Sequence, residues 1–259
     1  MSLEVQSLSV TLSGRPIVRE ASLSVAGGEC VGLVGPNGAG KTSLLRAIVG
    51  AAPKVGGAIS VGGVSLVDLK PKERARRIAY LPQDHHLEWA LGARDVVALG
   101  RTPYLGAFGA RTAQCDSVID ASMKSVHVDA LDGQPFSTLS GGEKARVLLA
   151  RALAVCAPVL LADEPVAALD PYHQLQVMEI LKSRAQAGDA VLVVLHDLNL
   201  AARFLDRVIL MSDGRIIDDG PPHDVLTKDA MENVYKVTPL SGDADGETWL
   251  IPWRRLKSD

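Results

Sequence analysis

Residues 35–42, which read GPNGAGKT, constrain the fold more than any other stretch of this sequence. Three glycines fall within eight residues, although each glycine in an ordered element costs about 0.5–1 kcal/mol relative to alanine. The apolar run 30–34 precedes the stretch, and the helix-forming run 43–49 follows it and ends at Gly50. The glycines are therefore predicted to form a turn that leads from a buried strand into a helix.

Such a turn is suited to bind an anion. A helix N-terminus leaves backbone N–H groups unpaired and carries a partial positive charge, and a loop without Cβ atoms can wrap around a phosphate. Lys41 adds a full charge and the Thr42 hydroxyl can ligate Mg²⁺, so the stretch is predicted to be a phosphate-binding loop rather than a plain glycine turn. The residues expected to bind phosphate are Gly35, Pro36, Asn37, Gly38, Ala39, Gly40, Lys41, Thr42 and Ser43.

Composition and charge exclude several classes of protein. The 259 residues suffice for one large domain or two small ones, and 47% of them are apolar. The net charge of −3 argues against a general nucleic-acid binder, and no apolar run reaches the roughly 18–20 residues that span a bilayer. Cys30, Cys115 and Cys156 form no C-x-x-C pair and fit a reducing compartment as buried apolar residues. We expect a soluble, cytosolic chain that reaches a membrane only through a partner.

Hydrophobic periodicity predicts an α/β fold. Short runs that alternate polar and apolar residues over 3–31 predict antiparallel strands. The apolar runs 159–162 and 190–195, separated by a helical pattern around 173–187, predict buried parallel strands. From 84 to 153 the pattern is helical, so a mostly parallel core is predicted to be split by a helical insert.

Carboxylates end one of these strands, where ligands of parallel sheets gather. Asp163 and Glu164 follow the apolar run 159–162, and Pro165 holds Glu164 extended. Successive strand side chains point to opposite faces, so the two acids need not share a role. The pattern predicts that Asp163 helps to hold Mg²⁺, while Glu164 orients or polarises an attacking water. A pair of solvated surface acids is the alternative.

Two further polar residues end strands. Gln83 follows the run 80–82, and its amide oxygen could reach Mg²⁺ or the attacking water. His196 ends the run 190–195, on the side where the phosphates should lie, although a lone histidine here is more often a core residue. Asp197 is interpreted as the N-cap of the next helix.

A second glycine pair opens a helix far along the chain. Residues 139–143 read LSGGE, in which Ser140 and Glu143 have the spacing of a capping box. A capping box alone does not favour glycines in the first turn, where each costs about 1 kcal/mol relative to alanine. Bare backbone at a helix N-terminus therefore predicts a second phosphate-binding end, formed by Ser140, Gly141 and Gly142.

Taken together, these stretches resemble the ATP-binding subunit of an ABC transporter. The family's motifs occur in its order along nearly the whole chain, and the signature motif is specific to the family. The matching positions are Walker A at 35–42, the Q-loop glutamine Gln83, the signature motif at 139–143, Walker B at 160–164, the D-loop at 168–170 and the switch histidine His196.

The resemblance implies an α/β fold: a P-loop NTPase core with a mostly parallel sheet, an N-terminal antiparallel β subdomain and an inserted helical subdomain. The whole chain, 1–259, would form one ATP-binding domain. In it, 1–83 and 154–240 would form the β subdomain and nucleotide-binding core, 84–153 the helical signature subdomain, and 241–259 a C-terminal tail.

The resemblance also implies the roles of the site residues. Two copies would form a head-to-tail homodimer, in which Ser140, Gly141 and Gly142 bind the γ-phosphate of the partner's ATP. Binding of ATP would close the dimer and hydrolysis would open it. The implied catalytic residues are Glu164, His196 and Gln83, and the implied ligands of Mg²⁺ are Thr42, Gln83 and Asp163.

The implied partners are transmembrane permease subunits and, indirectly, a substrate-binding protein, with no role for nucleic acid. The chain would then be peripheral at the cytoplasmic face of the cell membrane. Residues 95–103, DVVALGRTP, are similar to the subgroup that imports iron-siderophores, haem and cobalamin, although an amphipathic helix ending at Gly100 also explains them. An exporter with separate membrane chains and a soluble ABC protein of DNA repair or translation are the alternatives.

Two features depart from the family pattern. Val166 stands where Thr or Ser usually follows the Walker B glutamate and proline, which is expected to alter contacts across the dimer. Between residues 1 and 41 there is no Phe, Tyr, Trp or His to stack on adenine. The family's aromatic position matches Leu12 or Ser13 in this chain. We therefore expect nucleotide to be held mainly by its phosphates, with poor discrimination between ATP and GTP. A guanidinium of Arg15 or Arg19 lying over the base is the alternative.

The remaining polar stretches favour ordinary interpretations. His85 and His86 suggest a metal site, but a polar loop explains them better. Near the C-terminus, a polar loop is expected at 241–247 and a last strand near 248–251. Trp253 and the basic residues after it are interpreted as a solvated tail rather than a nucleic-acid contact.

Overall fold

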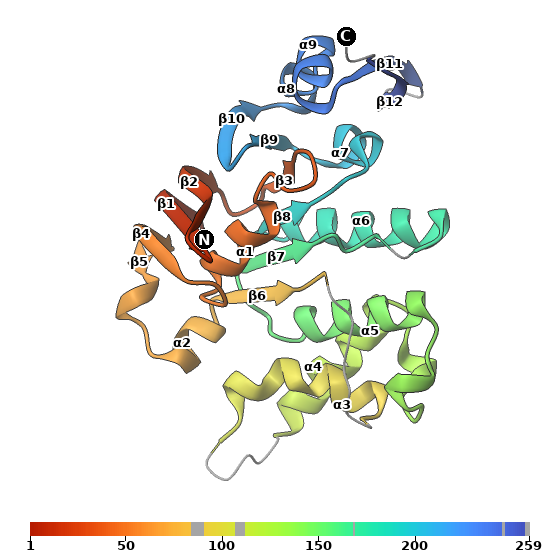
Figure 1. The fold of residues 1–259 in the computed structure, drawn as a ribbon. Helices are drawn as coiled ribbons and strands as arrows, with labels where there is room; N and C mark the ends of the chain where they lie inside the picture. Colours follow the sequence, from red (N-terminus) through yellow and green to blue (C-terminus); the bar gives the residue numbers. More distant parts are fainter. Residues whose placement is uncertain (84–90, 107–111, 168, 245–246, 257–259) are drawn as a thin grey trace.

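Two β-sheets that share a helix form the centre of the molecule (Figure 1). The computed structural model describes residues 1–83, 91–106, 112–167, 169–244 and 247–256. One sheet is antiparallel, with the strand order β2-β1-β4-β5; the other has the order β10-β9-β3-β8-β7-β6 and is parallel except for its edge strand β10. The helix α1 (Lys41–Ile48) contacts strands of both sheets. The predicted fold class is confirmed.

The strands have the following bounds. The antiparallel sheet contains β1 (Leu3–Leu12), β2 (Arg15–Val25), β4 (Lys54–Val61) and β5 (Val64–Ser65). The six-stranded sheet contains β3 (Cys30–Val34), β6 (Ile78–Leu81), β7 (Val159–Asp163), β8 (Ala190–Val194), β9 (Arg207–Ser212) and β10 (Arg215–Gly220). A separate hairpin contains β11 (Val237–Ala244) and β12 (Glu247–Arg255).

Helices cover both faces of the six-stranded sheet. Besides α1, they are α2 (Pro71–Ala75), α3 (Ala93–Ala98), α4 (Ala113–Ser125), α5 (Gly141–Leu153), α6 (Pro171–Gln186), α7 (Leu198–Phe204), α8 (Pro222–Val225) and α9 (Lys228–Ala230). Short turns of other helical types lie at η1 (Leu66–Asp68), η2 (Leu99–Tyr104), η4 (Asp129–Leu131), η5 (Phe136–Thr138) and the π-helix η6 (Met231–Tyr235). Within the described part of the chain, no helix is both long and apolar enough to cross a membrane.

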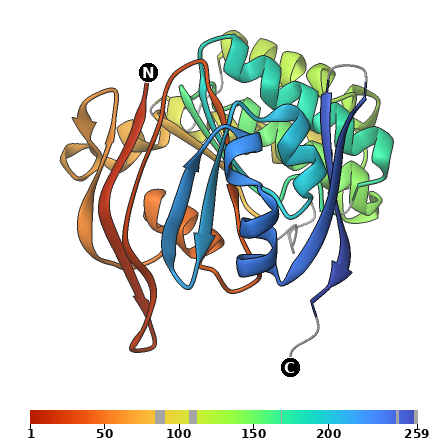
Figure 2. The same cartoon turned by 90° about the horizontal axis from the view of Figure 1, so that it is seen from above.

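The strands β3, β7 and β8 are buried along their whole length because both faces of the sheet are covered. Residues of one parity, such as Leu161 and Leu192, pack with α1 and the antiparallel sheet. Residues of the other parity, such as Leu160 and Val191, pack with the helical layer. Figure 2 shows the antiparallel sheet on one side of the molecule and the helices with the β11–β12 hairpin on the other. The strands β3, β6, β7, β8 and β9 run parallel, so their carboxyl ends lie at the same end of the sheet.

Packing accounts for the LGRTPY segment, 99–104, which forms η2. A Cβ on Gly100 would lie 2.2 Å from the backbone oxygen of Arg151, so only glycine permits this approach to α5. Arg101 is buried, and its guanidinium donates to the carbonyl of Ala154 at 2.8 Å. The Tyr104 ring stacks on the Arg101 guanidinium, which lies 3.8 Å from the ring centroid. The segment therefore fixes the helical layer at the end of α5.

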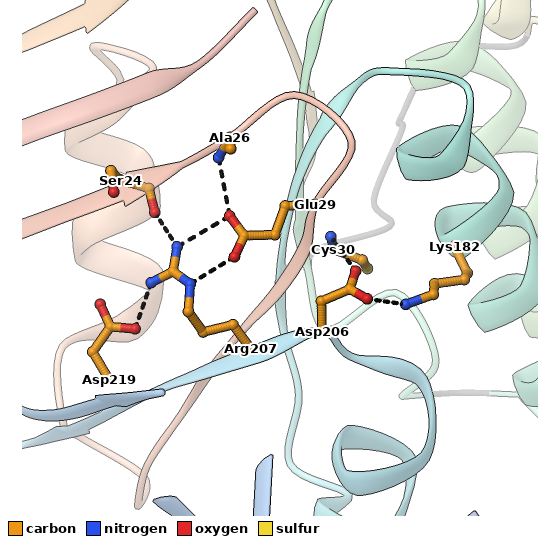
Figure 3. Close-up of polar contacts among 8 residues, drawn as sticks. All are labelled: Ser24, Ala26, Glu29, Cys30, Lys182, Asp206, Arg207 and Asp219. Carbon is orange, nitrogen blue, oxygen red and sulfur yellow. Dashed lines mark hydrogen bonds and ion pairs between the residues drawn. The ribbon is translucent and has the colours of Figure 1, made fainter. Parts of the chain in front are cut away.

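A polar network links the two sheets near the amino ends of the parallel strands (Figure 3). Arg207 of β9 donates to both carboxylate oxygens of Glu29, at 2.7 and 3.2 Å, and to the backbone oxygen of Ser24 at 2.5 Å. It also pairs with Asp219 of β10. Burial opposes ionisation of Glu29, but the bonds from Arg207 and the Ala26 N–H outweigh it and lower the pKa of Glu29.

Two local predictions are wrong. Residues 241–244, expected in a polar loop, belong to β11, and β12 extends to Arg255. This hairpin docks on α7: the Leu250 N–H donates to Asn199 Oδ1 at 3.3 Å. Polar residues are compatible with strand here because most of β12 is exposed. Cys156, expected to be buried like Cys30 and Cys115, is exposed in a left-handed turn after α5, with a φ of 54°.

Candidate active site

The glycine-rich loop 35–42, which is predicted to bind phosphate, lies between β3 and α1, as the sequence predicts. Its three glycines have positive φ values of 148°, 82° and 102° at Gly35, Gly38 and Gly40. A Cβ on Gly35 would lie 2.1 Å from the Met211 backbone oxygen, and one on Gly40 would lie 2.8 Å from that of Ile17. Both glycines are therefore required by close backbone approach as well as by conformation. The loop holds the N-terminal turn of α1 open toward a cleft.

Lys41 reaches back across this loop. Its side chain is buried, and Nζ donates to the backbone oxygens of Gly35 at 2.6 Å and Pro36 at 3.0 Å. Burial lowers the pKa of Lys41, while the nearby charges of Glu164 and Asp163 act in the opposite direction. The ammonium group is thus held at the mouth of the loop, where a phosphate would meet it.

Asp163 ends β7 below the loop and is fully buried. Two hydroxyls hold its carboxylate: Thr42 Oγ1 donates to Oδ1 at 3.1 Å, and the Tyr80 hydroxyl donates to Oδ2 at 3.3 Å. Burial raises the pKa of Asp163, and these two bonds counteract it. Burial also raises the pKa of Tyr80 to about 12, so the phenol stays protonated. A carboxylate beside the Thr42 hydroxyl is an oxygen-donor set of the kind that suits Mg²⁺.

Glu164 contacts two other residues predicted for the site, Gln83 and His196. One carboxylate oxygen lies 2.5 Å from His196 Nε2, and the other accepts a bond from Gln83 Nε2 at 2.8 Å. The expectation that Pro165 holds Glu164 extended is wrong: Glu164 has a φ of 52°, a left-handed conformation that costs a non-glycine residue about 1–3 kcal/mol. The strand register sets this geometry, because the Glu164 N–H also donates to the Val194 oxygen at 3.2 Å, just before His196.

A cleft of about 740 Å³ unites most of these groups. Nine of its ten lining residues come from the predicted site: Asn37, Gly38, Gly40, Lys41, Thr42, Ser43, Gln83, Glu164 and His196. The tenth, Ile17 of β2, was not predicted. Leu12, the expected base position, is not among the residues that line the cleft. Gly35, Pro36, Ala39 and Asp163, also predicted for the site, are not among the residues that line the cleft.

The signature residues lie apart from this cleft in the same chain. Ser140 caps α5 in a capping box, with the Glu143 N–H donating to its Oγ at 3.3 Å and the Ser140 N–H donating to Glu143 Oε2 at 2.8 Å. A Cβ on Gly141 would meet no atom within 4 Å, and one on Gly142 would make only an ordinary contact with Leu169. The chain itself therefore gives no steric reason for the two glycines. The capping box and an open helix end coexist here.

Two other predictions concern the segment after Glu164. Ala168 lies outside the described residues, while Asp170 caps α6 by accepting the His173 N–H at 3.0 Å. Val166 is buried in the chain's own core, so this side chain does not present a surface to a partner. Asp197 caps α7 by accepting two backbone N–H bonds, as predicted.

The minor alternatives concern the two histidines after Gln83 and the C-terminal region. His85 and His86 lie outside the described residues. Within the described ranges, no group of three or more His, Cys, Asp or Glu residues could hold a metal ion. Trp253 is exposed, in agreement with the solvated tail interpreted from the sequence, although it lies in the strand β12.

Sequence reasoning missed Tyr80 and Ile17. Both lie in strands, and their part in the site depends on which neighbours their side chains face. Tyr80 pairs in register with Leu161 of β7, two residues before Asp163, so all three side chains share a face. No local pattern announces this, because the two strands are far apart in sequence.

Comparisons with known proteins agree with this geometry. The family model described as ABC transporter matches residues 18–167. A hemin import ATP-binding protein, HmuV of Streptomyces coelicolor, is 46% identical over 228 residues, which cover 88% of this chain and 81% of that protein. A cobalamin import ATP-binding protein, BtuD of Halobacterium salinarum, is 42% identical over 97% of this chain and 64% of that protein.

Solved structures show the same fold. A chain assigned to a metal-chelate type ABC transporter in an inward-facing conformation superimposes with a TM-score of 0.84 at 22% identity and 98% coverage of both chains. The dimeric, ADP- and phosphate-bound ATP-binding cassette MJ0796 has a TM-score of 0.75 at 27% identity, covering 85% of this chain and 99% of that one. The matched family model spans more than half of the chain, and it includes the phosphate-binding loop, the signature motif and the Asp163–Glu164 pair. The chain therefore belongs to the ABC transporter family.

Proposed function

We propose that this chain is the ATP-hydrolysing subunit of a multi-chain importer that carries haem, cobalamin or an iron-siderophore. One observation carries the ATPase assignment: Gln83, Glu164 and His196 converge beside the phosphate-binding loop, at one edge of one sheet. The names of the relatives support import of haem or cobalamin. The siderophore part of the proposal rests on the similarity of residues 95–103.

The chain's own groups would act on ATP as follows. The loop's N–H groups and Lys41 bind the phosphates, which the helix N-terminus favours. Asp163, Thr42 and Gln83 would hold Mg²⁺, which neutralises charge on the phosphate oxygens when bound. Glu164 lies at the cleft with its carboxylate held by two donors, where it can orient a water and accept its proton. His196 then fixes the carboxylate and stabilises charge next to the γ-phosphate.

A second copy of the chain would complete the site. Ser140 and Gly141 are exposed, and neither they nor Gly142 line the cleft of their own chain, which supports their binding to the partner's nucleotide in a head-to-tail homodimer. A dimeric solved cassette with the same fold supports this arrangement. ATP binding would favour the closed dimer because the nucleotide contacts both chains only there.

The relatives named as import ATP-binding proteins support an association of this chain with membrane subunits. An import ATP-binding protein works with permease chains, so we infer that this chain lies at the cytoplasmic face of the cell membrane. The helical layer, α3 to α5, would pass the motion of the dimer to the permease. A substrate-binding protein would deliver the cargo.

Reconstitution tests the proposal. The chain is assembled in liposomes with candidate permease subunits, and ATP turnover is measured with a substrate-binding protein loaded with haem, cobalamin or a ferric siderophore. We expect stimulation by one of these cargoes. Turnover that no loaded binding protein changes would contradict import, and absence of Mg²⁺-dependent hydrolysis would contradict the ATPase assignment itself.

A further inference from the structure

Tyr80 contacts Asp163 of the proposed metal site but does not line the cleft. It lies in β6, next to β7, and its ring packs among the residues between the six-stranded sheet and α1. Its hydroxyl donates to Asp163 Oδ2 at 3.3 Å. Tyr80 is not among the residues that line the cleft, so it reaches the nucleotide only through Asp163.

The Asp163 carboxylate is held at both oxygens. Thr42 donates to Oδ1 from α1, and Tyr80 donates to Oδ2 from β6. Because the two donors come from different elements, the plane of the carboxylate is fixed by the packing of α1 on the sheet. A carboxylate oxygen that accepts one such bond keeps a further lone pair for a cation.

The two donors differ in what they can do. Thr42 lines the cleft and is itself a proposed ligand, so its hydroxyl must serve both the cation and Asp163. The Tyr80 hydroxyl does not line the cleft and is not a proposed ligand, so it bonds to Asp163 without this double demand. Arg46, one turn after Thr42 on α1, interacts with the Tyr80 hydroxyl and keeps the phenol in place.

We propose that Tyr80 is a positioning residue for the divalent cation: it holds Asp163 in the orientation that binds Mg²⁺ with ATP. This inference rests on the proposed ATPase function. Outer groups that orient a metal ligand typically contribute about 10–100-fold to metal affinity or activity. The hydroxyl of Tyr80 therefore has a role that the ring alone does not supply.

Tyr80→Phe tests the inference because it removes one oxygen and keeps the ring. Binding of a fluorescent ATP analogue to the purified full chain is measured with Mg²⁺ and, separately, with EDTA. Binding of Mn²⁺ to the chain–ATP complex is measured by electron paramagnetic resonance. Tyr104→Phe is the matched control, since that ring stacks on Arg101 far from the site.

We expect Tyr80→Phe to weaken Mn²⁺ binding and Mg²⁺-dependent ATP binding about tenfold, with metal-free ATP binding unchanged. Tyr104→Phe should match the wild type in all three measurements. Wild-type metal binding in Tyr80→Phe would overturn the inference, and so would an equal loss of metal-free binding, which would show a general structural role. Absence of ATP binding and of Mg²⁺-dependent hydrolysis in the wild type would contradict the proposed function instead.

Discussion

Replacing Glu164 by glutamine isolates the role of one carboxylate. The side chain keeps its shape, and its surroundings suit an amide: the oxygen can accept the bond from Gln83 Nε2, and the NH₂ group can donate to a neutral His196. The positive φ of 52° at this position is equally strained for both residues. Folding and the shape of the cleft should therefore persist, while the proton acceptor is lost.

The expected loss in turnover follows from that chemistry. A positioned general base contributes about 10²–10⁴-fold, which corresponds to roughly 2.7–5.4 kcal/mol of barrier at 1.36 kcal/mol per factor of ten. We expect turnover to fall within this range and ATP affinity to stay within about threefold, because phosphate binding falls to the loop and Lys41 rather than to Glu164. ATP should then accumulate in a closed dimer.

Three measurements check this prediction: phosphate release at saturating Mg²⁺-ATP, binding of a fluorescent ATP analogue, and molar mass by light scattering with ATP present. Glu179→Gln, an exposed acid of α6 away from the cleft, is the matched control. Wild-type turnover in Glu164→Gln would refute the catalytic role. A loss of ATP binding as large as the loss of turnover would show that the carboxylate acts in binding instead.

The remaining predictions concern binding and stability. Lys41→Ala should weaken ATP binding about 10–100-fold, since a charged hydrogen bond contributes about 1.5–3 kcal/mol; unchanged affinity measured by calorimetry would refute this. ATP and GTP should bind within about tenfold of each other, near 1.4 kcal/mol, because Ile17 supplies no ring for base stacking; a competition assay that shows a larger preference contradicts it. Arg207→Met should lower the free energy of unfolding by about 2 kcal/mol, whereas Arg203→Met, which breaks one exposed ion pair, should cost about 0.5 kcal/mol; equal urea midpoints would disprove the difference. Because the pKa of Glu29 is lowered in the folded state, its ion pair contributes fully to the free energy of unfolding above the ordinary pKa of 4.5. This contribution is lost as the pH falls through the pKa of the folded state, so the free energies of unfolding of the two variants should converge in acid.

Local sequence patterns determined the parts of the site that one segment builds alone. The loop at 35–42 requires glycine because its backbone approaches other backbone closely, and a phosphate-binding turn is visible in eight consecutive residues. The N-caps at Ser140 and Asp197 are likewise local, since a side chain bonds to a backbone N–H two or three residues later. Strand ends could also be predicted, because buried runs stop where polar residues begin.

Tertiary structure alone decided which distant residues meet. Tyr80 and Asp163 are separated by 83 positions, and their contact depends on β6 lying next to β7 in one register. A shift of one residue would turn Tyr80 to the other face of the sheet. The same reasoning applies to Ile17, which enters the cleft only because the antiparallel sheet packs over α1.

The C-terminal hairpin and Cys156 are places where the prediction from the sequence was wrong. Polar residues at 241–244 carry no strand periodicity, and they pair because β12 docks on α7 and presents its edge to β11. Cys156 is exposed because its left-handed turn ends α5 at the surface. A residue's type indicates only how often such residues are buried on average. Whether one position is buried depends on which elements of the fold cover it.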